Sequence, residues 1–466
     1  MSRISVAASR RSFLGGLAAL PILSTGLTGI ATPARADRSG ADLILIALAD
    51  LHSPYAALAG IVRAIRDVAD SAPGVPMAIL LNGDIFERGN AVAKNSEGMA
   101  DWAFLGALSA MAPVVLNIGN HEVALRADLA SVVASAKRLG ARVIGSVLDN
   151  RSGGFFAPVS TRLTVGTRRI GLIGLAPSDP MVWREAARDP LGLLDAASFA
   201  GSTMPTAFAG VDLAVVMSHA GLAADKAILP KLPAGALMIG GHNHLMLEHV
   251  ENGGLYLHAG CWGESITVIS VGFAGDTPTL TAETVPIDPD GPKDRAIAAI
   301  IDAATLAYLP TESREVIGAV PRTLNREDSI LFAADAVRRA AGADLALLNH
   351  SAFGATLRAG EQRVYDLDNF VRFDGDVMVA EVDAATLTTI LSRANQGSRT
   401  TLDARSGDYV HSDAITPEAG RTYAIAVSDW VAGRQAGFLG VEGLAFSPAP
   451  GVRVKAAVRD ALRNAA

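Results

Sequence analysis

From residue 43 to about residue 285, short apolar runs alternate with longer segments of helical periodicity. The helix-like segments include residues 56–69 and 99–111. Short apolar runs are typical of buried strands, and strands that alternate with helices form α/β folds. The sequence therefore predicts an α/β sandwich over residues 40–285. The strand-like runs are LILIAL, MAILLN, PVVLNI, RRIGLIGL, DLAVVMS, ALMIGG and GLYLHAG.

A second, smaller α/β domain is predicted for residues 321–466. Residues 286–320 are assigned to a linker with a connecting helix, because a Pro-, Asp- and Gly-rich stretch precedes a segment of helical periodicity at 295–308. Hydrophobic residues make up 50% of the 466 residues and charged residues 19%, which suits two folded cores. Beyond the linker, helix-like segments at 329–341 and 384–394 alternate with the runs DLALLN, DVMVAEV and YAIAVS.

Residues 1–36 have the features of an export signal. Arg10 and Arg11 precede Ser-Phe-Leu and an uncharged apolar stretch, as in signals of the twin-arginine pathway, and cleavage is expected after Ala36. The alternatives are an uncleaved signal anchor and a Sec signal with a chance arginine pair. We expect the twin-arginine export machinery to deliver the protein to the periplasm, with no membrane anchor once the signal is removed.

The charge of the chain argues against strong nucleic-acid binding, and its cysteine content argues against a disulfide. Four of the 40 basic residues and none of the 47 acidic residues lie in residues 1–36, so the rest of the chain has a formal charge of −11. This excess of acidic residues argues against strong nucleic-acid binding. Cys261 is the single cysteine, which excludes an intramolecular disulfide. We expect a monomer that is stabilised by packing.

Polar motifs follow five of the predicted strands. The carboxyl ends of strands in an open α/β sheet face one crevice, so these motifs are expected to converge. Their carboxylates, imidazoles and amide are ligands for Zn, Mn or Fe, and two ions about 3.5–4 Å apart can clamp both oxygens of a phosphoryl displacement. Taken singly, each motif is as consistent with a helix cap or a structural histidine. The motifs are Asp50-Leu51-His52, Asn82-Gly83-Asp84, Gly119-Asn120-His121-Glu122, Ser218-His219 and Gly241-His242-Asn243-His244.

The order D-x-H, G-D, G-N-H-E, lone His and G-H-x-H resembles the signature of the calcineurin-like metallophosphoesterase superfamily. This resemblance implies a four-layer α/β/β/α sandwich that binds two divalent ions, with Asp84 and a nucleophilic hydroxide bridging them. His121 would lie outside the ligand shell and protonate the leaving oxygen, so that His121, Asp84 and Asn120 are the implied catalytic residues. The implied ligands are Asp50, His52, Asp84 and His244 for one ion, and Asp84, Asn120, His219 and His242 for the other.

Residues 321–466 resemble the C-terminal substrate-binding domain of bacterial periplasmic 5′-nucleotidases and UDP-sugar hydrolases. The resemblance rests on Asn349, on the Leu-Arg-Ala-Gly block at 357–360, and on Asp429-Trp430 downstream. In that family two aromatic rings enclose the nucleobase, and Phe373 and Trp430 are at those positions, with Asn349 also implied at the substrate. The alternative is that both rings pack in the core of the small domain.

The chain departs from this family at three places. Gly354 replaces the arginine that grips the substrate phosphate, Ala124 replaces the aspartate that partners the catalytic histidine, and residues 434–437 read RQAG in place of G-G-D-G. Two compensations are expected. Arg88 would bind the substrate phosphate, unless it is a solvated surface residue, and Glu122 or another acid would orient His121.

The sequence thus predicts a dinuclear metal-dependent hydrolase of phosphate esters or anhydrides, with a nucleotide or nucleotide-like small molecule as substrate. Two alternatives stay open. One is a metal-bound nucleotide-binding protein with little turnover, which the changes at Ala124 and Gly354 motivate. The other is a thiosulfohydrolase, because such enzymes share the two-domain plan and twin-arginine export, although they carry another residue in place of His121.

Overall fold

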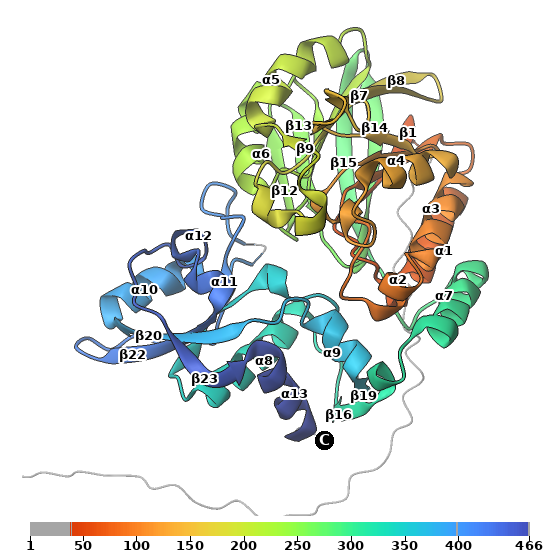
Figure 1. Cartoon of the computed structure of the whole chain (residues 1–466). Helices are drawn as coiled ribbons and strands as arrows, with labels where there is room; N and C mark the ends of the chain where they lie inside the picture. Colours follow the sequence, from red (N-terminus) through yellow and green to blue (C-terminus); the bar gives the residue numbers. More distant parts are fainter. Residues whose placement is uncertain (1–37, 39, 398, 465–466) are drawn as a thin grey trace, which may run out of the picture. The chain divides into compact units, whose positions relative to one another are not determined.

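The computed structural model describes residues 38, 40–397 and 399–464, which form an N-terminal and a C-terminal α/β domain (Figure 1). The predicted export signal, residues 1–36, lies outside the described residues. Within the part of the chain that is described, no helix is both long and apolar enough to cross a membrane.

Two six-stranded sheets form the centre of the first domain. The strand orders are β15-β14-β1-β2-β3-β4 and β12-β13-β11-β10-β8-β7. β1 is buried along its whole length between β2, to which it is parallel, and β14, to which it is antiparallel, so its sequence LILIAL is continuously apolar. The first sheet comprises β1 (Leu43–Leu48), β2 (Met77–Asn82), β3 (Val114–Asn117), β4 (Arg142–Ile144), β14 (Ser265–Ala274) and β15 (Thr277–Pro286). The second comprises β7 (Ser160–Val165), β8 (Arg168–Leu175), β10 (Leu213–Ser218), β11 (Leu237–Gly240), β12 (Met246–Glu251) and β13 (Gly254–Ala259).

The two sheets pack face to face, and helices cover their outer faces. Leu43 and Leu45 on β1 share a core with Val215 of the second sheet, whereas Ile44 and its neighbours on the opposite face pack against helices. This arrangement confirms the predicted four-layer α/β/β/α sandwich. The first sheet is covered by α1 (Tyr55–Ser71), α3 (Met99–Ser109) and α4 (Leu129–Arg138), and the second by α5 (Ala196–Ala207) and α6 (Leu222–Ile228).

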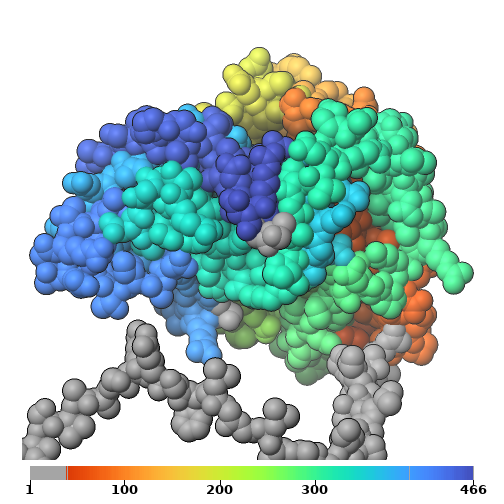
Figure 2. Space-filling model, turned by 90° about the horizontal axis from the view of Figure 1, so that it is seen from below, coloured from red at the N-terminus to blue at the C-terminus, as the bar shows by residue number. Residues whose placement is uncertain are grey.

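The helix α7 (Arg295–Tyr308) coincides with the segment expected in the linker, and it packs against α1 and α3. The second domain has a four-stranded sheet, β17-β22-β20-β23, between two groups of helices. In Figure 2 the dark blue C-terminal segment lies against teal residues, consistent with the packing of α13 (Val454–Asn464) on α8 (Arg326–Ala341). The other elements include α9 (Val364–Phe370), α10 (Ala384–Arg393), α11 (Asp429–Ala432), α12 (Gln435–Leu439), β20 (Asp376–Asp383), β22 (Thr422–Ser428) and β23 (Ser447–Arg453).

The apolar run at residues 344–349 is divided between two sheets. β17 (Leu345–Ala346) pairs with β22, whereas β18 (Leu348–Asn349) pairs with β21 (Val410–His411). The change of sheet brings Asn349 to the wall of the cavity described below.

Candidate metal centre

The seven side chains predicted as metal ligands follow strands of both sheets. Those after β1, β2 and β3 come from the first sheet, and those after β10 and β11 come from the second. Six of the seven are buried, and His242 is half-buried. The residues are Asp50, His52, Asp84, Asn120, His219, His242 and His244. The structure therefore brings all of the predicted ligands to one place, where the two sheets meet.

One group of donor atoms is formed by Asp50, His52 and His244. The Nε2 atoms of His52 and His244 lie 2.9 Å apart, and His244 Nε2 lies 3.8 Å from Asp50 Oδ1. These three residues belong to the first ligand set that the resemblance implied.

A second group is formed by Asp84, His219 and His242. His219 Nε2 lies 3.1 Å from Asp84 Oδ2, and His242 Nδ1 lies 3.0 Å from Asn120 Oδ1. Asp84 Oδ2 also lies 3.8 Å from His52 Nε2 in the first group. The Asp84 carboxylate is thus placed between the two groups, as a bridging ligand would be.

The backbone is strained at this centre. Non-glycine residues rarely adopt positive φ, and such conformations cost about 1–3 kcal/mol each. Five of the predicted ligands have positive φ: Asp50 (50°), His52 (55°), Asp84 (57°), His242 (75°) and His244 (54°). Strain concentrated on one set of converging side chains is characteristic of a functional site.

The electrostatics of the centre favour a bound cation. Burial raises the pKa of Asp50 to about 7, with a further contribution from Asp84. Burial alone would lower the pKa of His219, but the carboxylates of Asp84 and Asp50 outweigh it and raise that pKa to about 10. The carboxylates of Asp50 and Asp84 therefore favour a positive charge beside them, which divalent cations would supply. The donor set of imidazoles, carboxylates and one amide oxygen fits such ions.

The Glu122 carboxylate is bound by backbone amides. Its carboxylate accepts hydrogen bonds from the amides of Gly119, Asp84 and Ile85, at 2.6, 3.1 and 3.1 Å. It thereby holds together the two loops that carry Asp84 and Asn120. Of the two options in the expectation, Glu122 or another acid as the partner of His121, these contacts favour another acid, because three backbone amides already bind the Glu122 carboxylate.

A second acid faces His121 instead. Glu87 Oε2 lies 3.6 Å from His121 Nδ1 and 3.5 Å from His52 Nδ1. Arg372, from the loop after α9 in the second domain, binds the same oxygen at 2.6 Å. Sequence analysis missed both residues, although Glu87 immediately precedes Arg88 and Arg372 immediately precedes Phe373, two residues that it singled out.

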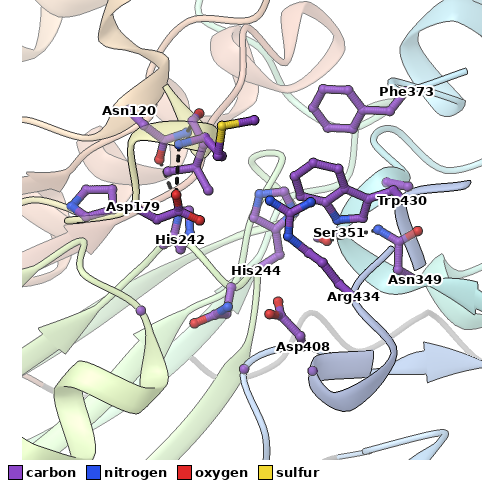
Figure 3. Close-up of a pocket in the computed structure, with 18 of the residues that line it drawn as sticks. Asn120, Asp179, His242, His244, Asn349, Ser351, Phe373, Asp408, Trp430 and Arg434 are labelled. Carbon is purple, nitrogen blue, oxygen red and sulfur yellow. Dashed lines mark hydrogen bonds between the residues drawn. The ribbon is translucent and has the colours of Figure 1, made fainter. Parts of the chain in front are cut away.

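A cavity of about 1010 Å³ opens next to this centre, with walls from both domains. In Figure 3, Asn120 and His242 lie on one wall and Asn349 and Trp430 on the other. Phe373 and Trp430 are 54% and 40% exposed, so they do not pack in the core as the alternative interpretation required. Arg88 is an exposed part of the same wall, and Asn349 is buried beside Ser351.

An arginine covers part of the predicted base-binding surface. The guanidinium carbon of Arg434 lies 3.4 Å from the centre of the Trp430 ring (Figure 3). Arg434 is the first residue of the RQAG segment that replaces the glycine-rich block of the family. A base that stacks on this face of Trp430 must therefore displace Arg434 or stack on its guanidinium plane.

His350 connects the second domain to the loop that carries two predicted ligands. Its Nε2 lies 2.7 Å from the carbonyl oxygen of Asn243, between His242 and His244. Its ring stacks on Tyr409 at a centroid distance of 3.9 Å. His350 is therefore buried structural support for the metal-binding loop.

Two family models match the chain. Residues 44–246 match calcineurin-like phosphoesterases, and residues 317–441 match the C-terminal domain of 5′-nucleotidases. In a search of curated proteins, none matched.

Solved structures with the same fold include a 5′-nucleotidase precursor from Thermus thermophilus, with 18% identity and a TM-score of 0.60 over 91% of this chain and 96% of that one. The sulfate thiohydrolase SoxB from the same organism has 14% identity and a TM-score of 0.63, covering 91% and 94% of the two chains. A 5′-nucleotidase from Candida albicans has 11% identity and a TM-score of 0.59, covering 91% and 98%. At these identities the similarity shows a shared two-domain fold.

Proposed function

Because the chain belongs to the calcineurin-like phosphoesterases and carries a 5′-nucleotidase C-terminal domain, we propose that it is a periplasmic, dinuclear hydrolase of nucleotides or nucleotide-like phosphoesters. The observation that carries this proposal is the pair of donor groups that meet at Asp84 beside a large cavity. We further propose that the protein is exported by the twin-arginine machinery and acts as a monomer.

Asp50, His52, Asp84 and His244 would hold one divalent cation, and Asp84, Asn120, His219 and His242 the other. When bound, the two cations would activate water and neutralise the charge on the phosphoryl oxygens. Zn, Mn and Fe all suit these ligands.

His121 is proposed to complete the hydrolysis. In hydrolysis the water oxygen forms a bond to phosphorus, and the bond between phosphorus and the leaving oxygen breaks. The leaving oxygen must then receive a proton. His121 follows the predicted ligand Asn120 and lines the cavity, where it can donate that proton. Burial lowers the pKa of His121, whereas the nearby carboxylates of Asp84 and Glu87 act in the opposite direction and favour the protonated imidazole that donation requires.

We expect protein loaded with Mn or Zn to hydrolyse at least one member of a panel of nucleoside monophosphates, nucleotide diesters, nucleotide anhydrides and aryl phosphoesters. Release of phosphate or of the alcohol is the measurement. Failure of fully metallated protein to turn over any member would contradict the proposal. Two further measurements test the alternative functions. Calorimetric binding of a nucleoside without turnover would favour a nucleotide-binding protein, and release of sulfate from a protein cysteine S-thiosulfonate would favour a thiosulfohydrolase.

The Trp430→Ala variant tests whether a base binds in the cavity. Stacking on an aromatic ring is worth about 1–3 kcal/mol, so KM for a nucleotide should rise by roughly 5- to 150-fold. KM for a small aliphatic phosphoester should not change, because that substrate has no ring to stack. An equal change in KM for both substrates would show that Trp430 supports the cavity and does not bind a base.

A further inference from the structure

The structure explains why the phosphate-gripping arginine of the family cannot occupy its usual position in this chain. A Cβ atom at Gly354 would lie 2.2 Å from the carbonyl oxygen of Asn369 and 2.7 Å from the ring of Trp262. No side chain fits there without movement of the backbone. Ala124, which replaces the aspartate of the family, has no carboxylate that could contact His121. If the protein hydrolyses phosphoesters, other residues must provide both functions.

Glu87 meets the requirements for the acid beside His121. It is 4% exposed, and its Oε1 accepts a hydrogen bond of 2.8 Å from the amide of Gly89, which fixes the carboxylate. Its Oε2 is 3.6 Å from His121 Nδ1, a separation that can shorten when substrate binds. An acid at Nδ1 sets the tautomer and orientation of the imidazole and leaves Nε2 for the substrate.

Arg372 meets the requirements for the phosphate ligand. Its side chain is 2% exposed, and its Nε and Nη2 atoms bind Glu87 Oε2 at 2.9 and 2.6 Å. Nη2 also lies 3.5 Å from His121 Nε2 and 3.3 Å from His52 Nδ1. The guanidinium therefore lies beside both His121 and the predicted ligand His52, next to the centre at which a phosphoryl group would bind.

We propose that Glu87 and Arg372 take over the two functions missing at positions 124 and 354. Glu87 is a positioning residue that orients His121 for proton donation, and Arg372 is a catalytic residue that binds the phosphoryl oxygens. This inference rests on the phosphoesterase function proposed above. It assigns part of the active site to the second domain, because Arg372 belongs to that domain. Arg372 is not at position 354, where the family has its arginine.

The test of Glu87 compares two substrates that differ in their leaving group. Because nitrophenolate leaves readily without a proton whereas an alkoxide does not, loss of proton donation should affect mainly the alkyl phosphoester. We expect Glu87→Gln to lower kcat by roughly 10- to 100-fold for the alkyl ester and by less than about 3-fold for the nitrophenyl ester. Glu87→Asp, which keeps the charge, should recover part of the alkyl ester activity.

Glu185→Gln makes the same chemical change at an exposed acid in the cavity wall and is the matched control. Metal content is measured for each variant, because Glu87 also lies near the predicted ligand His52. An equal loss of kcat on both substrates at full metal content, or a loss that added metal reverses, would overturn the assignment of Glu87.

Arg372→Ala and Arg372→Lys test the second half of the proposal. Because both substrates carry the same phosphoryl group, kcat/KM should fall by roughly 10- to 100-fold for each in Arg372→Ala, with smaller losses in Arg372→Lys. Unchanged kcat/KM in folded Arg372→Ala would overturn the assignment. Absence of hydrolysis by metal-loaded wild-type protein would instead count against the proposed function itself.

Discussion

The Asp84→Asn variant is expected to lower kcat for phosphoester hydrolysis by about 10³-fold or more, because loss of even one preorganised electrostatic contact costs about 10²–10³-fold. Asp84 Oδ2 lies 3.1 Å from His219 Nε2 and 3.8 Å from His52 Nε2, so it serves both donor groups. An amide keeps the shape of the side chain but removes the negative charge that two neighbouring cations need. The measurement is kcat on the best substrate of the panel, at saturating metal.

Asp101→Asn is the matched control for this variant. Asp101 is another buried aspartate of the same domain; it accepts a hydrogen bond of 2.8 Å from the Tyr55 hydroxyl and belongs to none of the donor groups. The control should retain activity near that of the wild type. If Asp84→Asn kept kcat within about tenfold of the wild type, the role of Asp84 as a shared ligand would be wrong.

Removal of divalent metal is expected to abolish activity and to destabilise the fold. Without cations, Asp50 and Asp84 remain buried together, and burial raises the pKa of Asp50 to about 7. A ligand present at 1,000 times its Kd stabilises the folded state by about 4 kcal/mol. The thermal midpoint should therefore fall by several degrees after chelation, and both activity and midpoint should return when Mn or Zn is added.

Magnesium at the same concentration is the control for this experiment, because a site rich in imidazole favours transition metals over Mg²⁺. Full activity of protein shown to be free of transition metal would contradict the prediction. An unchanged midpoint together with lost activity would show that the ions act in catalysis without stabilising the fold.

The fold could be predicted from sequence at most strands that are buried on both faces, although β14, which is buried over most of its length between β1 and β15, was not identified. β1 and β2 are continuous apolar runs, and their positions are evident without a structure. β15 was not identified, because its sequence TPTLTAETVP has only scattered apolar residues and alternates between partly and largely exposed positions. The two-residue strands β17 and β18 depend on partners more than 60 residues away, at His411 and Ile425, which local periodicity cannot reveal.

The same distinction applies to the candidate site. The seven predicted ligands follow strands directly, so the fold class alone was enough to predict that they converge. Glu87 and Arg372 are separated by 285 residues, and their contact depends on how the two domains meet. Neither residue has a local pattern that predicts the other. The sequence left open whether Glu122 or another acid orients His121 for the same reason, because the partners of Glu122 are backbone amides that the sequence does not identify.

The number of divalent ions bound by each chain is the most direct measure of the dinuclear centre. Protein loaded with Mn or Zn and freed of excess metal by gel filtration should contain two ions per chain by elemental analysis. His219→Ala should lose most of one ion, because His219 belongs to the group that contains Asp84 and His242. A fully active wild-type protein with one ion per chain, or with none, would contradict the account of a two-metal phosphoesterase.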